Sequence, residues 1–279
     1  MQNIRRYLVI LWLSCIPAVF VAQESQFGPV LLAPQANWLS GNSAPTLADL
    51  EPRPFPRVTV ARLPPNQALE TFESRGPYQN SELKGYTDQT LVMAELVDTS
   101  QRGAFELQRS YVAPRTLTFK PIHYTGDSFV KNNVITRILQ SEVDYATRSN
   151  AAETALTAAN YKFAYKGDQV LHGRAVHVFQ VKPREKRAGL FKGRIYLDSN
   201  TGNLARSEGV IVKSPSFFLR HIEFVEDYSD ISGYTLPVQL HTTARARFVG
   251  RTVVDIYHQQ YQPQPLAASL RANPAAGQQ

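Results

Sequence analysis

The side chains best suited to metal binding or acid–base chemistry in this chain are six histidines, which are scattered along the sequence. They are His123, His172, His177, His221, His241 and His258. Transition metals are usually held by ligands at short, regular spacing, as in HxH or HExxH motifs. The chain has no such motif and no cysteine cluster. Isolated histidines of this kind are typical of surfaces and strand edges, so we expect no metal and no cofactor.

Three carboxylates, Glu223, Glu226 and Asp227, lie close enough in sequence to suggest an acid–base pair of the glycosidase type. On a strand, however, Glu223 and Asp227 share one face and Glu226 points to the other. The segment 198–202 resembles the start of a calcium loop, but Gly202 comes one place early and no glutamate closes the loop, so we interpret it as a hairpin turn. There is no G-x-S-x-G motif and no phosphate-binding glycine loop. The sequence therefore does not predict an enzyme.

The elements that must position any site are mainly strands. From Tyr161 to Tyr261 the chain reads as an antiparallel meander, and residues 238–248 show the clearest alternation of apolar and polar side chains. A sheet with one apolar face buries that face against helices, another sheet or a ligand. Aromatic residues are spread over most strands, in numbers too large for a wet face, and they serve either as core or as the lining of an apolar cavity. They include Tyr111, Phe119, Tyr161, Phe163, Phe179, Phe191, Tyr196, Phe217, Phe218, Phe224 and Tyr228.

The first half of the domain is predicted to combine strands with helices. A short helix over 66–75 should end at Gly76-Pro77, and strands follow at 87–97, 104–112 and 116–124. An apolar stripe over 130–139 predicts an amphipathic helix, capped by Asp127 or Ser128. The Ala-rich stretch 150–160 can supply a second helical piece, and turns within the meander are predicted at Gly167-Asp168 and at Gly173.

The N-terminus has the pattern of a secretory signal. Arg5 and Arg6 precede an apolar run that ends near Ala22, and this run is short and interrupted for a membrane span. We expect a signal peptide over 1–22 and a periplasmic or secreted protein. Cys15 is the only cysteine, and the residues before it, Trp12-Leu13-Ser14, do not favour lipid attachment. The mature chain would then contain no cysteine and no disulfide.

Composition divides the rest of the chain into three parts. Residues 23–65 form a proline-rich arm or linker, residues 66–262 form one β domain, and residues 263–279 form a tail expected to be disordered. The 30 lysines and arginines exceed the 23 aspartates and glutamates only modestly and form no long block. Nucleic-acid binding is therefore not expected, whereas contact with a membrane surface is compatible with the charge.

Several turn and strand-edge residues resemble those of a known family. They are Val176 to Val181 followed by Lys182-Pro183, then Ile195-Tyr196-Leu197-Asp198, Thr201-Gly202 and Leu204, with Arg206-Ser207-Glu208-Gly209, Ser214-Pro215-Ser216-Phe217, Tyr234, Leu236-Pro237 and Gly250-Arg251 further on. This pattern is similar to the LolA/LolB-like periplasmic lipoprotein carrier superfamily and to secreted proteins described as outer membrane lipoprotein-sorting-like. The resemblance implies an α+β, mainly antiparallel β fold: a strongly curved sheet or unclosed β-barrel with a few helices packed on the concave side. It also implies non-covalent binding of a lipid or lipoprotein acyl chain, and an arginine that pins a lid, for which Arg102, Arg109 and Arg115 are the candidates.

We therefore predict a non-catalytic binding protein that holds a lipid or acyl chain in the cavity of a curved sheet, with a role in outer-membrane lipoprotein sorting. An alternative is a cell-envelope interaction or sensor module of the same fold, and an enzyme ranks third. The expected partner is a hydrophobic ligand or an envelope lipoprotein. The candidate cavity residues, which would serve equally well as plain core, are Ile222, Phe224, Val238, Leu240, Ala244, Ala246 and Phe248.

Overall fold

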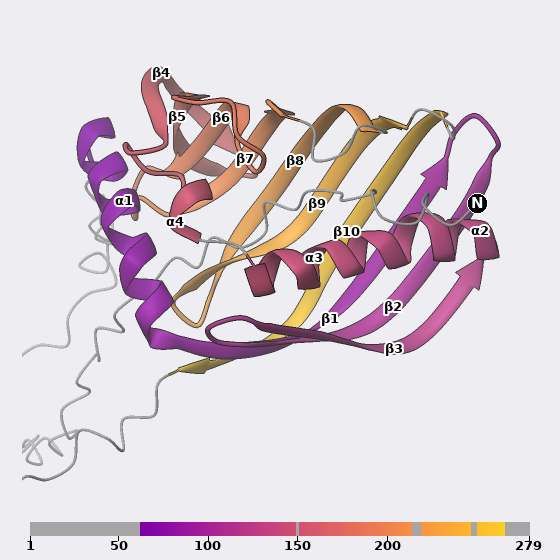
Figure 1. Cartoon of the computed structure of the whole chain (residues 1–279). Helices are drawn as coiled ribbons and strands as arrows, with labels where there is room; N and C mark the ends of the chain where they lie inside the picture. Colours follow the sequence, from indigo (N-terminus) through magenta and orange to yellow (C-terminus); the bar gives the residue numbers. More distant parts are fainter. Residues whose placement is uncertain (1–61, 149–150, 214–218, 247–249, 266–279) are drawn as a thin grey trace, which may run out of the picture. The chain divides into compact units, whose positions relative to one another are not determined.

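The structure, a computed structural model, contains one ten-stranded antiparallel sheet with helices against one of its faces (Figure 1). It describes residues 62–148, 151–213, 219–246 and 250–265. The predicted signal peptide and most of the proline-rich arm lie outside these ranges. Among the described residues, no helix is both long enough and apolar enough to cross a membrane.

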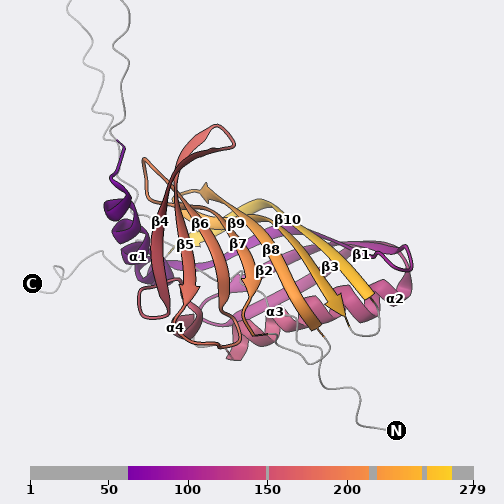
Figure 2. The ribbon, with the colours of Figure 1, turned by 90° about the horizontal axis from the view of Figure 1, so that it is seen from above.

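The strands follow one another across the sheet except at a single crossing. The order is β3-β2-β1-β10-β9-β8-β7-β6-β5-β4, so β1 pairs with β10 and joins the two ends of the domain. The strands β3 and β4 remain at the edges, so the sheet is not closed into a barrel, and Figure 2 shows its curvature from above. The predicted fold class is confirmed. The strands are β1 Leu83–Leu96, β2 Gln101–Val112, β3 Thr116–Gly126, β4 Tyr161–Leu171, β5 Arg174–Pro183, β6 Phe191–Asp198, β7 Leu204–Ile211, β8 Leu219–Ile231, β9 Tyr234–Ala246 and β10 Gly250–Pro265.

The helical material between β3 and β4 lies across the concave face of the sheet (Figure 1). It consists of α2 Ser128–Val130, the π-helical turn η2 Lys131–Ile135, α3 Thr136–Arg148 and the short α4 Ala151–Thr154. The predicted cap is confirmed, since the side chain of Asp127 accepts a hydrogen bond from the backbone N–H of Phe129 at 2.7 Å. The predicted amphipathic helix is also present, and it continues past residue 139.

The main core cluster lies between this helix and the concave face. The apolar stripe of the helix belongs to one cluster with buried side chains from nearly all strands, because residues three and four apart share one helix face and point to the sheet together. Its buried members are Phe72, Val92, Ala94, Leu96, Phe105, Leu107, Val130, Val134, Ile135, Ile138, Leu139, Leu156, Tyr161, Phe179, Val181, Leu190, Phe191, Ile195, Leu197, Leu204, Ile211, Ile222, Phe224, Tyr228, Leu240, Val254 and Ile256.

The first helix departs from the prediction. Helix α1 runs Pro65–Glu82 and passes through Pro77, where the sequence predicted a stop. A side chain before proline would clash with the ring in helical conformation, but Gly76 has no Cβ to clash. Beyond it, the fully buried Gln79 donates from Nε2 to the carbonyl oxygen of Thr235 at 3.3 Å, which fixes the last turn against β9.

Two strand predictions are corrected as well. Gly167-Asp168 is not a turn but part of β4, which has an irregular register between Tyr165 and Gly167. The φ of Gly167 is +110°, so glycine allows the strand to bulge here without ending. The predicted turn at Gly173 is confirmed, and both His172 and Gly173 have positive φ angles there. At the other end, β10 extends to Pro265, three residues past the predicted domain boundary.

Candidate functional site

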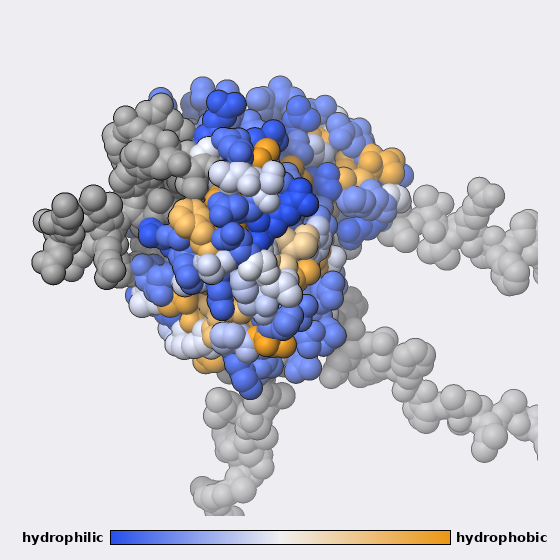
Figure 3. All heavy atoms as spheres, turned by 90° about the vertical axis from the view of Figure 1, so that its right-hand side faces the viewer, coloured by the Kyte–Doolittle hydropathy of each residue, from blue (hydrophilic) through white to orange (hydrophobic). Residues whose placement is uncertain are grey.

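Exposed apolar side chains do not by themselves mark the site. The face in Figure 3 is mainly hydrophilic, with hydrophobic residues in separate small patches. Scattered apolar residues of this kind are normal on a protein surface. A hollow that connects the surface to the core is a stronger sign of a binding site.

Such a hollow, here called the α3 groove, lies between β2–β3 and the helical segment η2–α3. Its volume is about 480 Å³, which is within the range of small-molecule sites. Phe105, Leu107 and Leu139 at its base belong to the main core cluster, so the groove opens onto the core. Ile122 on the edge strand β3 borders it and is 56% exposed. The groove is lined by Phe105, Leu107, Phe119, Pro121, Ile122, His123, Tyr124, Lys131, Thr136 and Leu139.

A single ammonium group borders this groove. The Nζ of Lys131 lies 4.8 Å from the ring centroid of Tyr124 and 5.2 Å from that of Phe105. The two rings meet edge to face, with centroids 5.5 Å apart. Cation–π contacts of this type hold the ammonium against the aromatic wall without neutralising its charge. The α3 groove thus combines apolar walls with one fixed positive charge.

A buried polar cluster occupies the concave face beneath α3. The Nε of Arg109 on β2 donates to Oδ2 of Asp88 on β1 at 2.7 Å, and its Nη2 donates to the hydroxyl of Tyr261 on β10 at 2.7 Å. Its guanidinium lies 5.1 Å from the ring centroid of Tyr86 and 5.8 Å from that of Tyr261. The charge of Arg109 is therefore held by one carboxylate and two aromatic rings.

The other oxygen of Asp88 contacts Thr90 on the same strand and His258 on the neighbouring β10. The hydroxyl of Thr90 donates to Oδ1 at 2.6 Å, and Nδ1 of His258 lies 3.2 Å from the same oxygen. Burial alone raises the pKa of Asp88, but the charge of Arg109 and these hydrogen bonds outweigh it and lower the pKa to about 2. Burial and the charge of Arg109 lower the pKa of His258 to about 4. At neutral pH the cluster thus contains an ionised Asp88 beside a neutral His258.

Two buried glutamates complete this cluster. Glu142 comes from the inner face of α3 and Glu226 from β8, and burial raises the pKa of each to about 7. Oε2 of Glu226 accepts a hydrogen bond from the hydroxyl of Tyr228 at 2.6 Å, and its Oε1 is buried without a hydrogen-bond partner in the described part of the chain. Arg109, Asp88 and Glu226 all act electrostatically on Glu142. Helix α3 therefore packs on the sheet with a buried carboxyl group, that of Glu142, whose pKa lies near neutral pH.

The candidate cavity residues are distributed between core and strand end. Ile222, Phe224 and Leu240 are buried in the main core cluster, and the half-buried Ala244 packs against it. Val238 is half-buried at an irregularity in the pairing of β8 with β9 and is not part of that cluster. Ala246 is the last residue of β9, and Phe248 lies outside the described residues. The five of these residues whose side chains the structure describes do not line the α3 groove, which the sequence reasoning did not find.

The three arginines suggested by the resemblance are now distinguishable. Arg102 pairs with Glu95 at 2.9 Å and has a 72% exposed side chain, and Arg115 is exposed. Arg109 alone among the three is buried. A sequence signal for the cluster existed, because Asp88 and Thr90 fall in phase with the buried Val92, as Arg109 does with Leu107. A charge at a core position of an alternating strand predicts a buried, paired group.

The carboxylates considered for catalysis do not converge. Glu223 is exposed and lies 2.6 Å from His221, whereas Asp227 pairs with Arg206 at 2.6 Å. Glu226 is buried on the opposite face. At 198–202, Oδ1 of Asp198 accepts hydrogen bonds from the backbone of Asn200 and Thr201, as in an ordinary hairpin turn. The described residues contain no group of three or more metal-ligating side chains.

Comparison with solved structures finds several that are similar to this chain at low sequence identity. A LolA superfamily protein from Nitrosomonas europaea matches over 75% of this chain and 97% of its own, with 10% identity and a TM-score of 0.36. A putative outer membrane lipoprotein-sorting protein domain from Vibrio parahaemolyticus matches over 72% and 94%, with 12% identity and a TM-score of 0.37. A DUF1329 family protein from Desulfovibrio piger matches over 72% and 93%, with 9% identity and a TM-score of 0.37. No family model and no curated protein matches the chain.

Proposed function

We propose that this protein is a non-catalytic binding protein of the periplasm or of the secreted fraction, and that it holds an acyl chain of a lipid or lipoprotein in the α3 groove. The observation that carries the proposal is the groove itself. It is apolar, has a volume of about 480 Å³ and reaches from the exposed Ile122 to core residues such as Leu107. Apolar surface removed from water by a bound chain supplies the binding free energy, about 25 cal/mol per Å².

The position of α3 gives the ligand a route to the interior. Leu139 of α3 forms part of the groove and of the main core cluster, so an outward movement of the helix would lengthen the groove. The chain could then reach Ile222, Phe224 and Leu240, which belong to the same cluster. In this proposal α3 acts as a lid on the concave face of the sheet. The α3 groove is the gap between this lid and strands β2 and β3.

The proposal is tested by the binding of a dansyl-labelled undecanoic acid, followed by fluorescence. The variant Ile122→Asp places a charge on the groove at an exposed position, where the fold tolerates it. We expect it to weaken binding by about tenfold, because a side chain that covers the ligand becomes charged. The matched control is Val170→Asp on β4, an apolar strand residue that is 75% exposed and does not line the groove.

Three results would decide the matter. Loss of affinity in Ile122→Asp but not in Val170→Asp supports an acyl chain in the groove. Equal affinity in both variants overturns this location. A wild-type protein that binds no labelled chain, and from which native mass spectrometry releases no lipid, overturns the carrier function and favours the interaction module.

A further inference from the structure

The convex face of the sheet, opposite the α3 groove, carries charges in cross-strand pairs. Arg206 faces Asp227, Arg194 faces Glu208 and His241 faces Asp255, each pair directly opposite in register on adjacent strands. Their charged atoms lie 2.6, 3.7 and 2.7 Å apart, respectively. Opposite charges in such positions stabilise a sheet.

One row on this face departs from that pattern. Arg245 on β9 is directly opposite Arg251 on β10 and, on its other side, opposite the register position of Arg220 on β8. Arg245 and Arg251 are both exposed. Within the described residues, neither forms an ion pair with a carboxylate closer than 4 Å. Like charges in directly opposed positions destabilise a sheet. Binding of an anion between these arginines would neutralise their charges.

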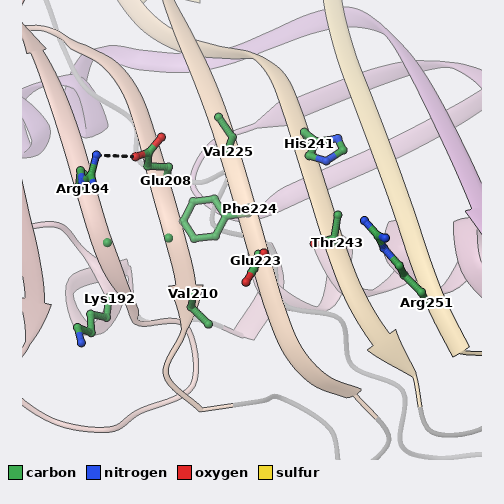
Figure 4. Close-up of a pocket in the computed structure, with 12 residues that line it drawn as sticks. Lys192, Arg194, Glu208, Val210, Glu223, Phe224, Val225, His241, Thr243 and Arg251 are labelled. Atoms are coloured by element: carbon green, nitrogen blue, oxygen red, sulfur yellow. Dashed lines mark ion pairs between the residues drawn. The ribbon is translucent and has the colours of Figure 1, made fainter. Parts of the chain in front are cut away.

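A hollow lies at this row. It has a volume of about 160 Å³ and is bordered by His221, Glu223, Thr243, Ala244, Arg245 and Arg251. It adjoins a wider trough across β6–β10, where Figure 4 shows the side chain of Arg251 extending towards Thr243. Lys192 adds a further positive charge at the far side of the trough. The carboxylate of Glu223 is held by His221 at 2.6 Å, which leaves it less available to the arginines.

The backbone of β8 is distorted beside this hollow. His221 has a φ of +51°, and the pairing of β8 with β9 is irregular between Arg220 and Glu223. A non-glycine residue in the left-handed region costs free energy and is found preferentially at functional sites. Here the distortion places the imidazole of His221 at the rim of the hollow, next to Glu223.

We propose that Arg245 and Arg251 form an anion-binding site on the convex face that takes a phosphate group. Guanidinium groups present paired N–H donors that match phosphate oxygens, and two of them side by side can share one phosphate. The hydroxyl of Thr243 borders the same hollow and is available as a third donor. The phosphate can come from a phospholipid headgroup or from a soluble phosphate compound. This site does not depend on the α3 groove.

The test uses the mature full-length protein with two probes. Binding of inorganic pyrophosphate is measured by calorimetry, and binding to vesicles of phosphatidylcholine with or without phosphatidylglycerol is measured by flotation. We expect the double variant Arg245→Gln/Arg251→Gln to bind at least one of these probes about tenfold more weakly than the wild type. The control is Lys162→Gln/Arg174→Gln, which removes the same charge from exposed positions on β4 and β5.

A second readout separates a site from a general charge effect. Removing two facing arginines relieves repulsion, so the double variant should melt at a higher temperature than the wild type in phosphate-free buffer and should lose the rise in Tm that phosphate gives the wild type. Pyrophosphate binding lost only in the arginine variant supports a soluble phosphate ligand. Vesicle binding lost only in that variant, without pyrophosphate binding, supports a lipid headgroup. No binding of either probe, or equal loss in the control, overturns the proposal.

Discussion

The Nε of Arg109 lies 2.7 Å from Oδ2 of Asp88, and the two side chains are only 2% and 0% exposed. This ion pair joins β2 to β1 on the concave face, and the hydroxyl of Tyr261 extends it to β10. In the described sheet, the pairing of β1 with β10 is the one pairing between strands that do not follow each other in sequence. A charged network at that position holds the two parts of the sheet together through groups that must remain paired.

Replacement of Arg109 by methionine should therefore be strongly destabilising. The change would leave Asp88 buried without its main countercharge, which typically costs about 3–5 kcal/mol. The control is Arg102→Met on the same strand, whose pair with Glu95 is exposed and should contribute less than about 1 kcal/mol. Urea unfolding measures both. The double variant Asp88→Leu/Arg109→Met should recover part of the loss, and a double variant no more stable than Arg109→Met would contradict this explanation.

The buried Glu142 predicts a stability that falls as the pH rises. Burial raises its pKa from 4.5 to about 7, with Arg109 opposing the shift and with Asp88 and Glu226 supporting it. A carboxyl whose pKa is higher in the folded state contributes its full stabilisation below its unfolded pKa, and this contribution is lost as the pH rises through the folded pKa. For Glu142 the loss therefore extends from about pH 4.5 to just above pH 7.

The variant Glu142→Gln removes this titration. Its free energy of unfolding should be close to that of the wild type at pH 4 and should exceed it at pH 8 by on the order of 3 kcal/mol. Hydrogen exchange should show α3 opening more often in the wild type than in the variant at pH 8. Glu106→Gln, an exposed acid on β2, controls for the loss of one negative charge. A stability difference that does not widen between pH 4 and pH 8 would show that Glu142 does not respond to pH in this way.

The sequence was sufficient for the elements whose patterns are local. Alternation along β9 and the stripe at Val130, Val134 and Ile138 are properties of neighbouring residues, and the structure bears out both a curved antiparallel sheet and a helix on its concave face. The path of α1 through Pro77 was not predictable in the same way. It depends on the contact of Gln79 with Thr235, which are 156 residues apart.

The sites were harder to predict because they form between distant strands. Asp88, Arg109 and His258 come from β1, β2 and β10. The β1–β2 pairing places Arg109 opposite Asp88, and the pairing of β1 with β10, which are far apart in sequence, adds His258. The arginine row likewise requires the register of β9 with β10, since Arg245 and Arg251 are separated by a hairpin in the sequence. Arg109 stands in phase with the buried apolar residues of β2, and this made it an unusual position in the sequence. Its partners could not be identified from its neighbours in the sequence.

The ammonium of Lys131 predicts a preference among acyl ligands, if the α3 groove binds them. It borders the groove against Tyr124 and Phe105, where it would lie near the polar end of a bound chain. Lys131→Met keeps an unbranched side chain and removes the charge. We expect affinity for a long-chain fatty acid to fall about fivefold, which corresponds to one exposed charge-assisted contact, while affinity for its methyl ester stays unchanged. Loss of the cation–π contacts should lower stability by about 0.5–1 kcal/mol.

Competition against a fluorescent acyl probe measures both ligands on the same protein. Lys162→Met on β4, which is exposed and does not line the groove, controls for the loss of one positive charge. If the acid and the ester lose affinity equally in Lys131→Met, the side chain acts through packing alone. If only the acid loses affinity, the groove recognises the anionic end of the ligand as well as its chain, because the two ligands differ only in that charge.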